Sequence, residues 1–359
     1  MEWLTCLFLG GLLRLTTALV PMSRRESLNA ATMLVGSAGG GLESEKLVVQ
    51  VDSPVNDANI ALPRTTISMP RIGYSLYKTP TEQVPEGVRL ALAAGVRHYD
   101  VATAYGTTAA AATVLHNDIS VEPISMQHKV SNTEQSTSVR QVKQAVRRQL
   151  RALPSNRAST TVLLHSPVTD RERRISSYAA LAELQASGTI DAIGVAHFGV
   201  GALNELVVTA DLPVPQLIQL ELSPFSQHRD IIDWAQHRAS VVQCAAFSKL
   251  SSVNGPQEGW ARLGAVATTY GCTKQQILIR WAIQKGYACV PRSNSRYKVE
   301  RAAIQENSWG ATKGIVISDA DMKLLDRLDE QIAAGRLGLV DGWEEGDILD
   351  GSWDPTIVV

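Results

Sequence analysis

The feature that most constrains this chain is a regular alternation of two hydrophobic patterns from about residue 46 onward. Short apolar or β-branched runs, typical of buried strands, alternate with stretches in which apolar residues recur every three or four positions, as in amphipathic helices. The short runs are Ile72–Leu76, His98–Val101, Ser125–Val130, Thr160–His165, Ala192–Val195, Leu217–Leu220, Val241–Phe247 and Ala288–Pro291. Examples of the helical stretches are Val84–Ala94, Val139–Ala152, Tyr178–Ala186, Leu203–Ala210, Gly259–Tyr270 and Thr273–Lys285.

Strands separated by helices pair in parallel, which leaves a doubly wound open sheet or a (β/α)8 barrel as candidate architectures. The open sheet that binds dinucleotides carries a GxGxxG turn after an early strand, and no such turn follows the first strands here. We therefore predict an α/β fold, a one-domain (β/α)8 TIM barrel over residues 46–335. It opens with an N-terminal β-hairpin whose strands are Lys46–Val51 and Ile60–Ser68, with turn residues at 52–57 between them.

The composition excludes several kinds of partner. The 359 residues hold 34 Lys+Arg against 35 Asp+Glu, so nothing indicates a basic surface for nucleic acid. Cys6, Cys244, Cys272 and Cys289 show no CxxC spacing, and the histidines show no metal-binding spacing. We therefore expect neither a disulfide framework nor a metal site.

Residues 1–45 differ in character from the rest of the chain. The run Trp3–Leu13 is apolar but too short to span a bilayer, which suits the central region of a signal peptide. Arg24 and Arg25 precede an Ala/Gly-rich stretch, as in a twin-arginine signal, whereas Arg14 fits a standard signal peptide badly. We expect either a targeting segment for a plastid or the secretory pathway, or a retained disordered tail on a cytoplasmic protein. In neither case is a membrane span expected in the mature chain.

Polar residues lie where predicted strands end, which is where a parallel barrel carries its reactive groups. Asp100 ends the second strand, and Tyr105 lies in the loop that follows it. Lys129 lies at the end of the third strand, and His165 ends the fourth.

Together these groups form a proton donor. A lysine ammonium stabilises a nearby phenolate and lowers the tyrosine pKa from its usual value of about 10. A carboxylate paired with the lysine keeps the ammonium charged, and a neutral histidine donates a hydrogen bond that places a carbonyl oxygen beside the tyrosine hydroxyl. Such a site protonates a carbonyl oxygen while a hydride from an external donor reaches the carbon.

These residues stand in blocks that resemble the aldo-keto reductase family over roughly residues 46–330. In chain order the blocks are Met69–Ser75, Gly95–Gly106, Leu164–Pro167, Gly194–Phe198, Gln219–Pro224, Phe247–Leu250 and Val290–Ser293. The resemblance implies a (β/α)8 barrel that reduces an aldehyde or ketone to an alcohol with NADPH, and a C-terminal loop, residues 336–359, over the active-site face. It implies catalytic roles for Asp100, Lys129 and His165, with Tyr105 as the proton donor.

Further positions match the family's cofactor-binding residues. They are His197, Gln219, Phe247, Ser248, Leu250, Arg292, Ser293, Asn294 and Lys298. By resemblance, Gln219 binds the carboxamide of the nicotinamide, Phe247 stacks on its ring, and Arg292 and Lys298 hold the 2′-phosphate. Ala196 and His197 replace a Ser-Asn pair that is usual in the family.

A non-catalytic regulatory subunit that binds the cofactor on the same fold is the alternative. The complete set of catalytic residues favours an enzyme, whereas the change at Ala196 and His197 leaves room for the regulator. A barrel with a different chemistry would need another polar cluster at the strand ends, and the sequence shows none. We expect a monomer that takes a small-molecule carbonyl substrate.

Overall fold

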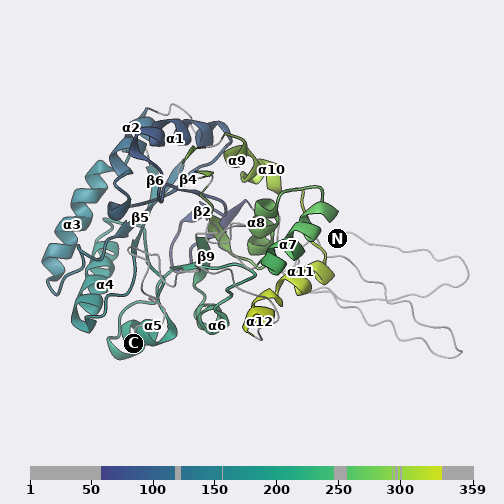
Figure 1. Ribbon diagram of the computed structural model, residues 1–359. Helices are drawn as coiled ribbons and strands as arrows, with labels where there is room; N and C mark the ends of the chain where they lie inside the picture. Colours follow the sequence, from purple (N-terminus) through teal and green to yellow (C-terminus); the bar gives the residue numbers. More distant parts are fainter. Residues whose placement is uncertain are drawn as a thin grey trace, which may run out of the picture. The chain divides into compact units, whose positions relative to one another are not determined.

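Eight parallel strands follow one another in chain order around the centre of the protein (Figure 1). They are β3 (Tyr74–Ser75), β4 (His98–Ala102), β5 (Ile124–Val130), β6 (Arg157–Leu164), β7 (Ala192–Ala196), β8 (Leu217–Glu221), β9 (Val241–Ala245) and β10 (Ala288–Val290). A parallel bridge between Ile72 and Cys289 joins the first strand to the last, and Ser75 N donates to Pro291 O at 3.1 Å. The strands therefore form a nearly closed barrel, which confirms the predicted fold class.

The computed structural model describes residues 58–117, 123–155, 157–245, 257–292, 294–295, 298–299 and 301–333. All of these lie within one compact unit, Asp52–Val359. The predictions for the targeting segment, for the strand Lys46–Val51 and for the C-terminal loop 336–359 fall outside the described residues.

Helices surround the strands of the barrel (Figure 1). The main ones are α1 (Val84–Ala93), α2 (Thr108–His116), α3 (Val139–Ala152), α4 (Arg171–Ala186), α5 (Val200–Asn204), α6 (Arg229–His237), α7 (Gln257–Thr269) and α8 (Lys274–Gln284). Short helices follow β10: α9 (Arg301–Glu306), α10 (Trp309–Thr312), α11 (Asp319–Leu325) and α12 (Leu328–Ala333). Ser138 caps α3, and Thr273 forms a capping box with Gln276 at α8, so both helices begin where the sequence predicts.

Helix α4 begins seven residues before the predicted start at Tyr178. Its first turns are rich in arginine and carry few apolar residues, so hydrophobic periodicity does not reveal them. Two polar interactions stabilise this end instead. The Asp170 side chain accepts from Arg173 N, and the buried Arg174 guanidinium pairs with Glu205.

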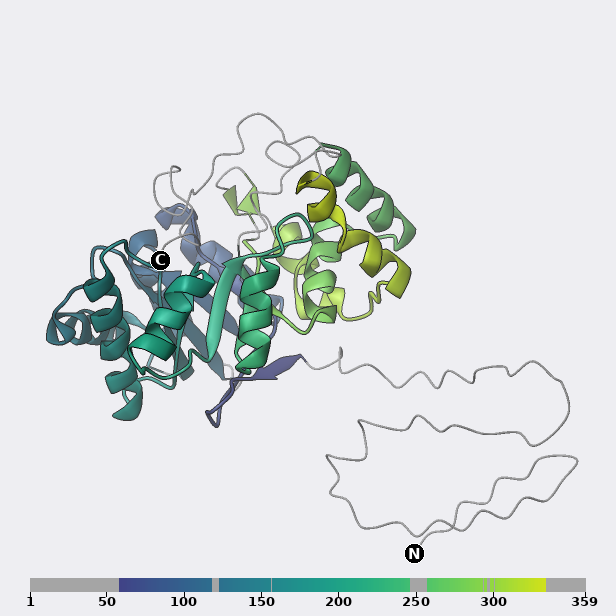
Figure 2. The ribbon, with the colours of Figure 1, turned by 90° about the horizontal axis from the view of Figure 1, so that it is seen from below.

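The hairpin lies further along the chain than predicted. Strand β1 (Asn59–Ala61) pairs antiparallel with β2 (Ser68–Pro70), so the predicted strand Ile60–Ser68 runs through the actual turn. The turn is held by Thr65 Oγ1, which donates to Leu62 O at 2.7 Å, and the β-branched Thr residues of this turn mimic a strand in sequence. Leu62 and Met69 belong to a buried cluster that includes the first residues of β7 to β10, namely Ala192, Leu217, Val241 and Ala288. Figure 2 shows the hairpin at the lower edge of the barrel. The hairpin therefore covers the amino-terminal end and leaves the carboxyl-terminal end for the site.

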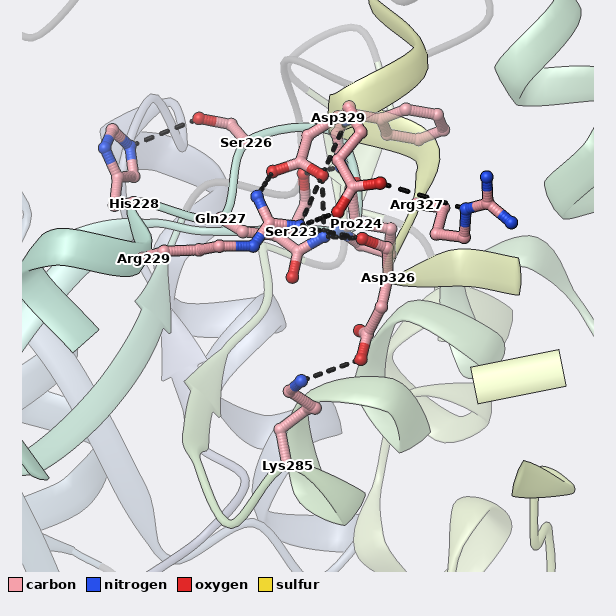
Figure 3. A network of polar contacts seen from close by, with 12 residues as sticks. Ser223, Pro224, Ser226, Gln227, His228, Arg229, Lys285, Asp326, Arg327 and Asp329 are labelled. Atoms are coloured by element: carbon pink, nitrogen blue, oxygen red, sulfur yellow. Dashed lines mark hydrogen bonds and ion pairs between the residues drawn. The ribbon is translucent and has the colours of Figure 1, made fainter. Parts of the chain in front are cut away.

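Polar contacts tie the last helices to the barrel (Figure 3). Asp326, between α11 and α12, accepts from Trp281 Nε1 at 2.7 Å and from Lys285 Nζ at 2.8 Å. Gln227, in the loop after β8, donates to Asp326 O at 2.8 Å, and Arg229 forms an ion pair with Asp329. These contacts fix α12 next to the β8–α6 loop.

Replacing Asp326 with alanine is expected to lower the free energy of unfolding by about 1.5–3 kcal/mol, because hydrogen bonds to a charged group are lost and the buried Trp281 N–H is left without an acceptor. Urea unfolding followed by fluorescence measures this loss. Glu330→Ala is the control, since Glu330 is exposed and its ion pair with Arg229 spans 3.6 Å, so a loss below about 0.5 kcal/mol is expected. Equal losses in the two variants would contradict a stabilising role for Asp326.

Candidate active site

The predicted catalytic residues meet at the carboxyl-terminal end of neighbouring strands. β4 carries Asp100, β5 carries Lys129, and His165 directly follows β6. Tyr105 ends a short 3-10 turn, Thr103–Tyr105, which Gly106 terminates with a left-handed φ of 67° that glycine adopts without strain. Because parallel strands end on the same side of a barrel, all four side chains reach one place.

The contacts within this group match the predicted proton donor. The Lys129 ammonium forms an ion pair with Asp100, and both side chains are buried. Lys129 Nζ also donates to Tyr105 Oη at 3.1 Å. The His165 ring meets the Tyr105 ring edge-on, with centroids 5.6 Å apart. The geometry thus brings together all four residues that the sequence singles out.

The electrostatics differ from the sequence-based expectation in one respect. Burial raises the pKa of Tyr105 well above its usual value, and the Asp100 carboxylate raises it further. Burial also lowers the pKa of Lys129, against the opposing effect of Asp100. The sequence predicts that the Lys129 ammonium depresses the tyrosine pKa, but the charge of the ammonium is largely compensated by the Asp100 carboxylate paired with it. Tyr105 therefore stays protonated at neutral pH, as a proton donor must.

His165 is neutral in this environment. Burial lowers its pKa well below the usual value, and the charge of Lys129 adds to this effect. Its Nδ1 is buried and has no hydrogen-bond partner in the described part of the chain. A neutral imidazole donates a hydrogen bond without adding a positive charge to the site.

A layer of buried glutamines lies beneath Asp100, and sequence reasoning missed most of it. Gln127 Nε2 donates to Asp100 Oδ1 at 2.8 Å and to Gln243 Oε1 at 2.9 Å. Gln219 Nε2 donates to Gln243 Oε1 at 2.7 Å and reaches Asp100 Oδ1 at 3.4 Å. Ser75 Oγ donates to Asp100 Oδ2 at 2.9 Å. For Gln243 the sequence signal is a polar residue inside a strand that is otherwise apolar, whereas Gln127 lies in a strand that also carries Ser125, His128 and Lys129.

The other predicted cofactor residues are placed only in part. His197 follows β7 in a left-handed conformation, with φ of 61°, and its N–H donates to Gln219 O at 2.8 Å. Arg292 follows β10 and is half-buried. Asn294 and Lys298 lie on the short paired strands β11 (Asn294–Ser295) and β12 (Lys298–Val299), whose side chains are outside the described residues. Phe247, Ser248, Leu250 and Ser293 also lie outside the described residues.

The described ranges show neither a membrane-spanning helix nor a metal site. No helix there has the length and apolarity needed to cross a membrane. No group of three or more His, Cys, Asp or Glu residues in those ranges is arranged to hold a metal ion.

A profile of the Aldo/keto reductase family matches residues 71–330, which is more than half of the chain. A buried lysine–aspartate pair against a tyrosine at the carboxyl end of a parallel barrel agrees with that match. The chain belongs to the aldo/keto reductase family, and it is an NAD(P)H-dependent oxidoreductase.

Individual relatives are distant. An aldo-keto reductase of Mycobacterium sp. (strain JLS) is 28% identical over 281 residues, which are 76% of this chain and 92% of that protein. Methylglyoxal reductase DkgA of Escherichia coli O157:H7 is 27% identical over 227 residues, 63% of this chain and 79% of that protein. An uncharacterized oxidoreductase of Schizosaccharomyces pombe is 34% identical over 168 residues, which are 47% of this chain and 56% of that protein.

Solved structures agree with the fold. An aldo/keto reductase from Brucella melitensis has a TM-score of 0.66 and 23% identity, and the match covers 76% of this chain and 99% of that one. A mutant of Gox0644 in complex with NADPH has a TM-score of 0.65 and 24% identity, and the match covers 80% of this chain and 96% of that one. At this identity the likeness supports the barrel architecture alone.

Proposed function

We propose that this protein reduces an aldehyde or ketone to the alcohol, with NADPH as hydride donor and Tyr105 as proton donor. The observation that carries the proposal is the contact of the buried Lys129 ammonium with both the Asp100 carboxylate and Tyr105 Oη, the latter at 3.1 Å. The relative named as a methylglyoxal reductase supports a small carbonyl compound as substrate.

The described residues fit a nicotinamide dinucleotide. Gln219 Nε2 donates a hydrogen bond to Gln243 Oε1. The Oε1 atom of Gln219 makes no hydrogen bond within the described residues, so this oxygen is the atom that would accept from the carboxamide. His197 lies beside it in the adjacent loop, and the Arg292 guanidinium suits the doubly charged 2′-phosphate. When bound, the reduced cofactor supplies the hydride.

The chain's own residues perform the acid chemistry. His165 donates a hydrogen bond to the carbonyl oxygen and places that oxygen beside Tyr105. Tyr105 gives its proton to the same oxygen, and the Lys129 ammonium, 3.1 Å away, stabilises the phenolate that remains. Asp100 keeps Lys129 charged in a site from which water is largely excluded.

The test is to mix the purified full-length protein with NADPH and a panel of aldehydes and ketones that includes methylglyoxal. Loss of NADPH absorbance with at least one of them is expected. A protein that binds NADPH tightly and turns over no member of the panel would instead support the regulatory subunit on the same fold.

Replacing Arg292 with alanine is expected to weaken NADPH binding by about tenfold or more and to leave NADH binding nearly unchanged, because one charge-assisted hydrogen bond to phosphate is worth about 1.5–3 kcal/mol. Fluorescence titration with each cofactor measures both dissociation constants. Arg89→Ala, which removes an exposed arginine from α1, is the matched control and should change neither constant. Equal losses for NADPH and NADH in Arg292→Ala would show that Arg292 does not bind the 2′-phosphate.

A further inference from the structure

We propose that Gln243 is a positioning residue that fixes the amide orientation of Gln219, so that Gln219 presents its carbonyl oxygen to the cofactor carboxamide. The inference rests on the proposed function, because it takes a nicotinamide carboxamide as the group that Gln219 meets. It assigns a role to a residue on β9 that lies one layer below the reacting groups.

The position of Gln243 makes it a shared acceptor. It is fully buried, and its Oε1 accepts from Gln127 Nε2 at 2.9 Å and from Gln219 Nε2 at 2.7 Å. Its own Nε2 lies 3.3 Å from His98 Nε2. The Gln243 side chain, on β9, thus contacts side chains of β4, β5 and β8, and the contact on β8 is the amide of Gln219.

The charge of Asp100 fixes the direction of this network. Asp100 Oδ1 is 2.8 Å from Gln127 and 3.4 Å from Gln219, and a carboxylate oxygen accepts hydrogen bonds only from donors. Both glutamines must therefore turn their NH2 groups toward Asp100, although this leaves the buried Gln127 Oε1 without a partner in the described part of the chain. The atom that lies between their NH2 groups must then be the oxygen of Gln243.

The contact of Gln243 with His98 supports the same orientation of the Gln243 amide, with Oε1 toward the two glutamines and Nε2 toward His98. If Gln243 donates from Nε2, the His98 Nε2 must accept, and the His98 hydrogen must lie on Nδ1, which contacts Ser125 Oγ at 3.2 Å. A neutral ring is required, and burial lowers the pKa of His98 to about 4, with Asp100 and Lys129 exerting opposing effects. A chain of hydrogen bonds runs from Asp100 through Gln127, Gln243 and His98 to Ser125, and every bond in it is then consistent with one set of amide orientations.

The consequence for Gln219 is specific. With its NH2 group held between Gln243 and Asp100, its Oε1 is oriented away from both. Without the Gln243 acceptor, only the longer contact to Asp100 would hold the amide, and Gln219 would lose its preference for presenting oxygen. Gln243 thus controls how well the site recognises an NH2 group on the cofactor.

The experiment compares NADP⁺ with its 3-acetylpyridine analogue, in which a methyl ketone replaces the carboxamide and no NH2 remains. Fluorescence titration of the full-length protein gives the two dissociation constants. The wild type should bind NADP⁺ about fivefold or more tightly than the analogue, as expected for one hydrogen bond. In Gln243→Met this ratio should fall to within about twofold.

The control and the double variant separate positioning from mere stability. Gln216→Met removes a buried glutamine just before β8, whose Oε1 accepts from Ile193 N at 2.8 Å, so it should cost stability and leave the ratio unchanged. Combining Gln243→Met with Gln219→Met should lower NADP⁺ affinity no further than Gln219→Met alone. If Gln243→Met does not fold, Gln243→Asn, which withdraws the amide by one carbon, should give the same reduced ratio.

The outcomes are distinguishable. A wild-type ratio that persists in Gln243→Met or Gln243→Asn, or additive losses in the double variant, would overturn the role of Gln243. A wild-type protein that binds neither dinucleotide would instead contradict the proposed function.

Discussion

Tyr105→Phe is expected to reduce the turnover of carbonyl reduction by about 10²–10⁴-fold or more, because a positioned proton donor contributes an effect of that size. The hydroxyl is the only group removed, and the ring keeps its contacts with His165 and with the ring of Tyr77, 5.2 Å away. NADPH binding should stay within about twofold of wild type, since no hydrogen bond to the cofactor is assigned to this hydroxyl. Steady-state kinetics and fluorescence titration on the same preparation measure the two quantities.

Tyr77→Phe is the matched control. It removes a second phenolic hydroxyl from the same cluster without touching the contact between Lys129 and Tyr105. Its turnover should remain within about tenfold of wild type. If Tyr105→Phe instead keeps turnover within a few-fold, another group donates the proton, and the role given to Tyr105 is wrong.

Much of the barrel was predictable because its strands are buried on both faces and read as short apolar runs. The predicted strand His98–Val101 and the helix Val139–Ala152 agree with β4 and α3 to within one residue. The failures have a common cause. At the start of α4 and in the β1–β2 turn, side-chain hydrogen bonds to the backbone set the structure, and hydrophobic periodicity does not register them.

The catalytic group was predictable because each member lies near the carboxyl end of a strand or just after it, and strand order then brings the four together. The strength of their interactions was not predictable. The pKa of Tyr105 depends on how deeply the site is buried and on Asp100 compensating the charge of Lys129, which are properties of the assembled barrel. The roles of Gln127 and Gln243 were not predictable, because a polar residue within a strand becomes meaningful only when several strands bring such residues into contact.

Acid is expected to destabilise this protein more than any single surface substitution would. His98 and His128 are both fully buried within the described structure, and burial lowers the pKa of each to about 4. For His128, Glu134 opposes the effect of burial and Lys129 adds to it. Both rings are therefore neutral in the folded protein at neutral pH.

The direction of the pH effect follows from proton binding. A histidine in the unfolded chain titrates at about 6.5, so between about pH 6.5 and 4 the unfolded chain binds more protons than the folded one. The stability contributed by each neutral ring is thus fully present above about pH 6.5 and is lost as the pH falls toward 4. Each histidine lowers the free energy of unfolding by about 1.4 kcal/mol per pH unit within that window.

Urea unfolding at pH 7 and at pH 5 tests this expectation, because His98 and His128 together should lower the free energy of unfolding by about 3–4 kcal/mol over those two pH units once the onset near pH 6.5 is included. The buried His165, whose pKa also lies well below its usual value, should lower it further. His128→Gln removes one of these three titrating histidines and should reduce the difference in the free energy of unfolding between the two pH values by about a third. His237→Gln, at an exposed position on α6, should leave the difference unchanged. An equal difference in His128→Gln and wild type would mean that the acid sensitivity arises from carboxylates rather than from the buried histidines.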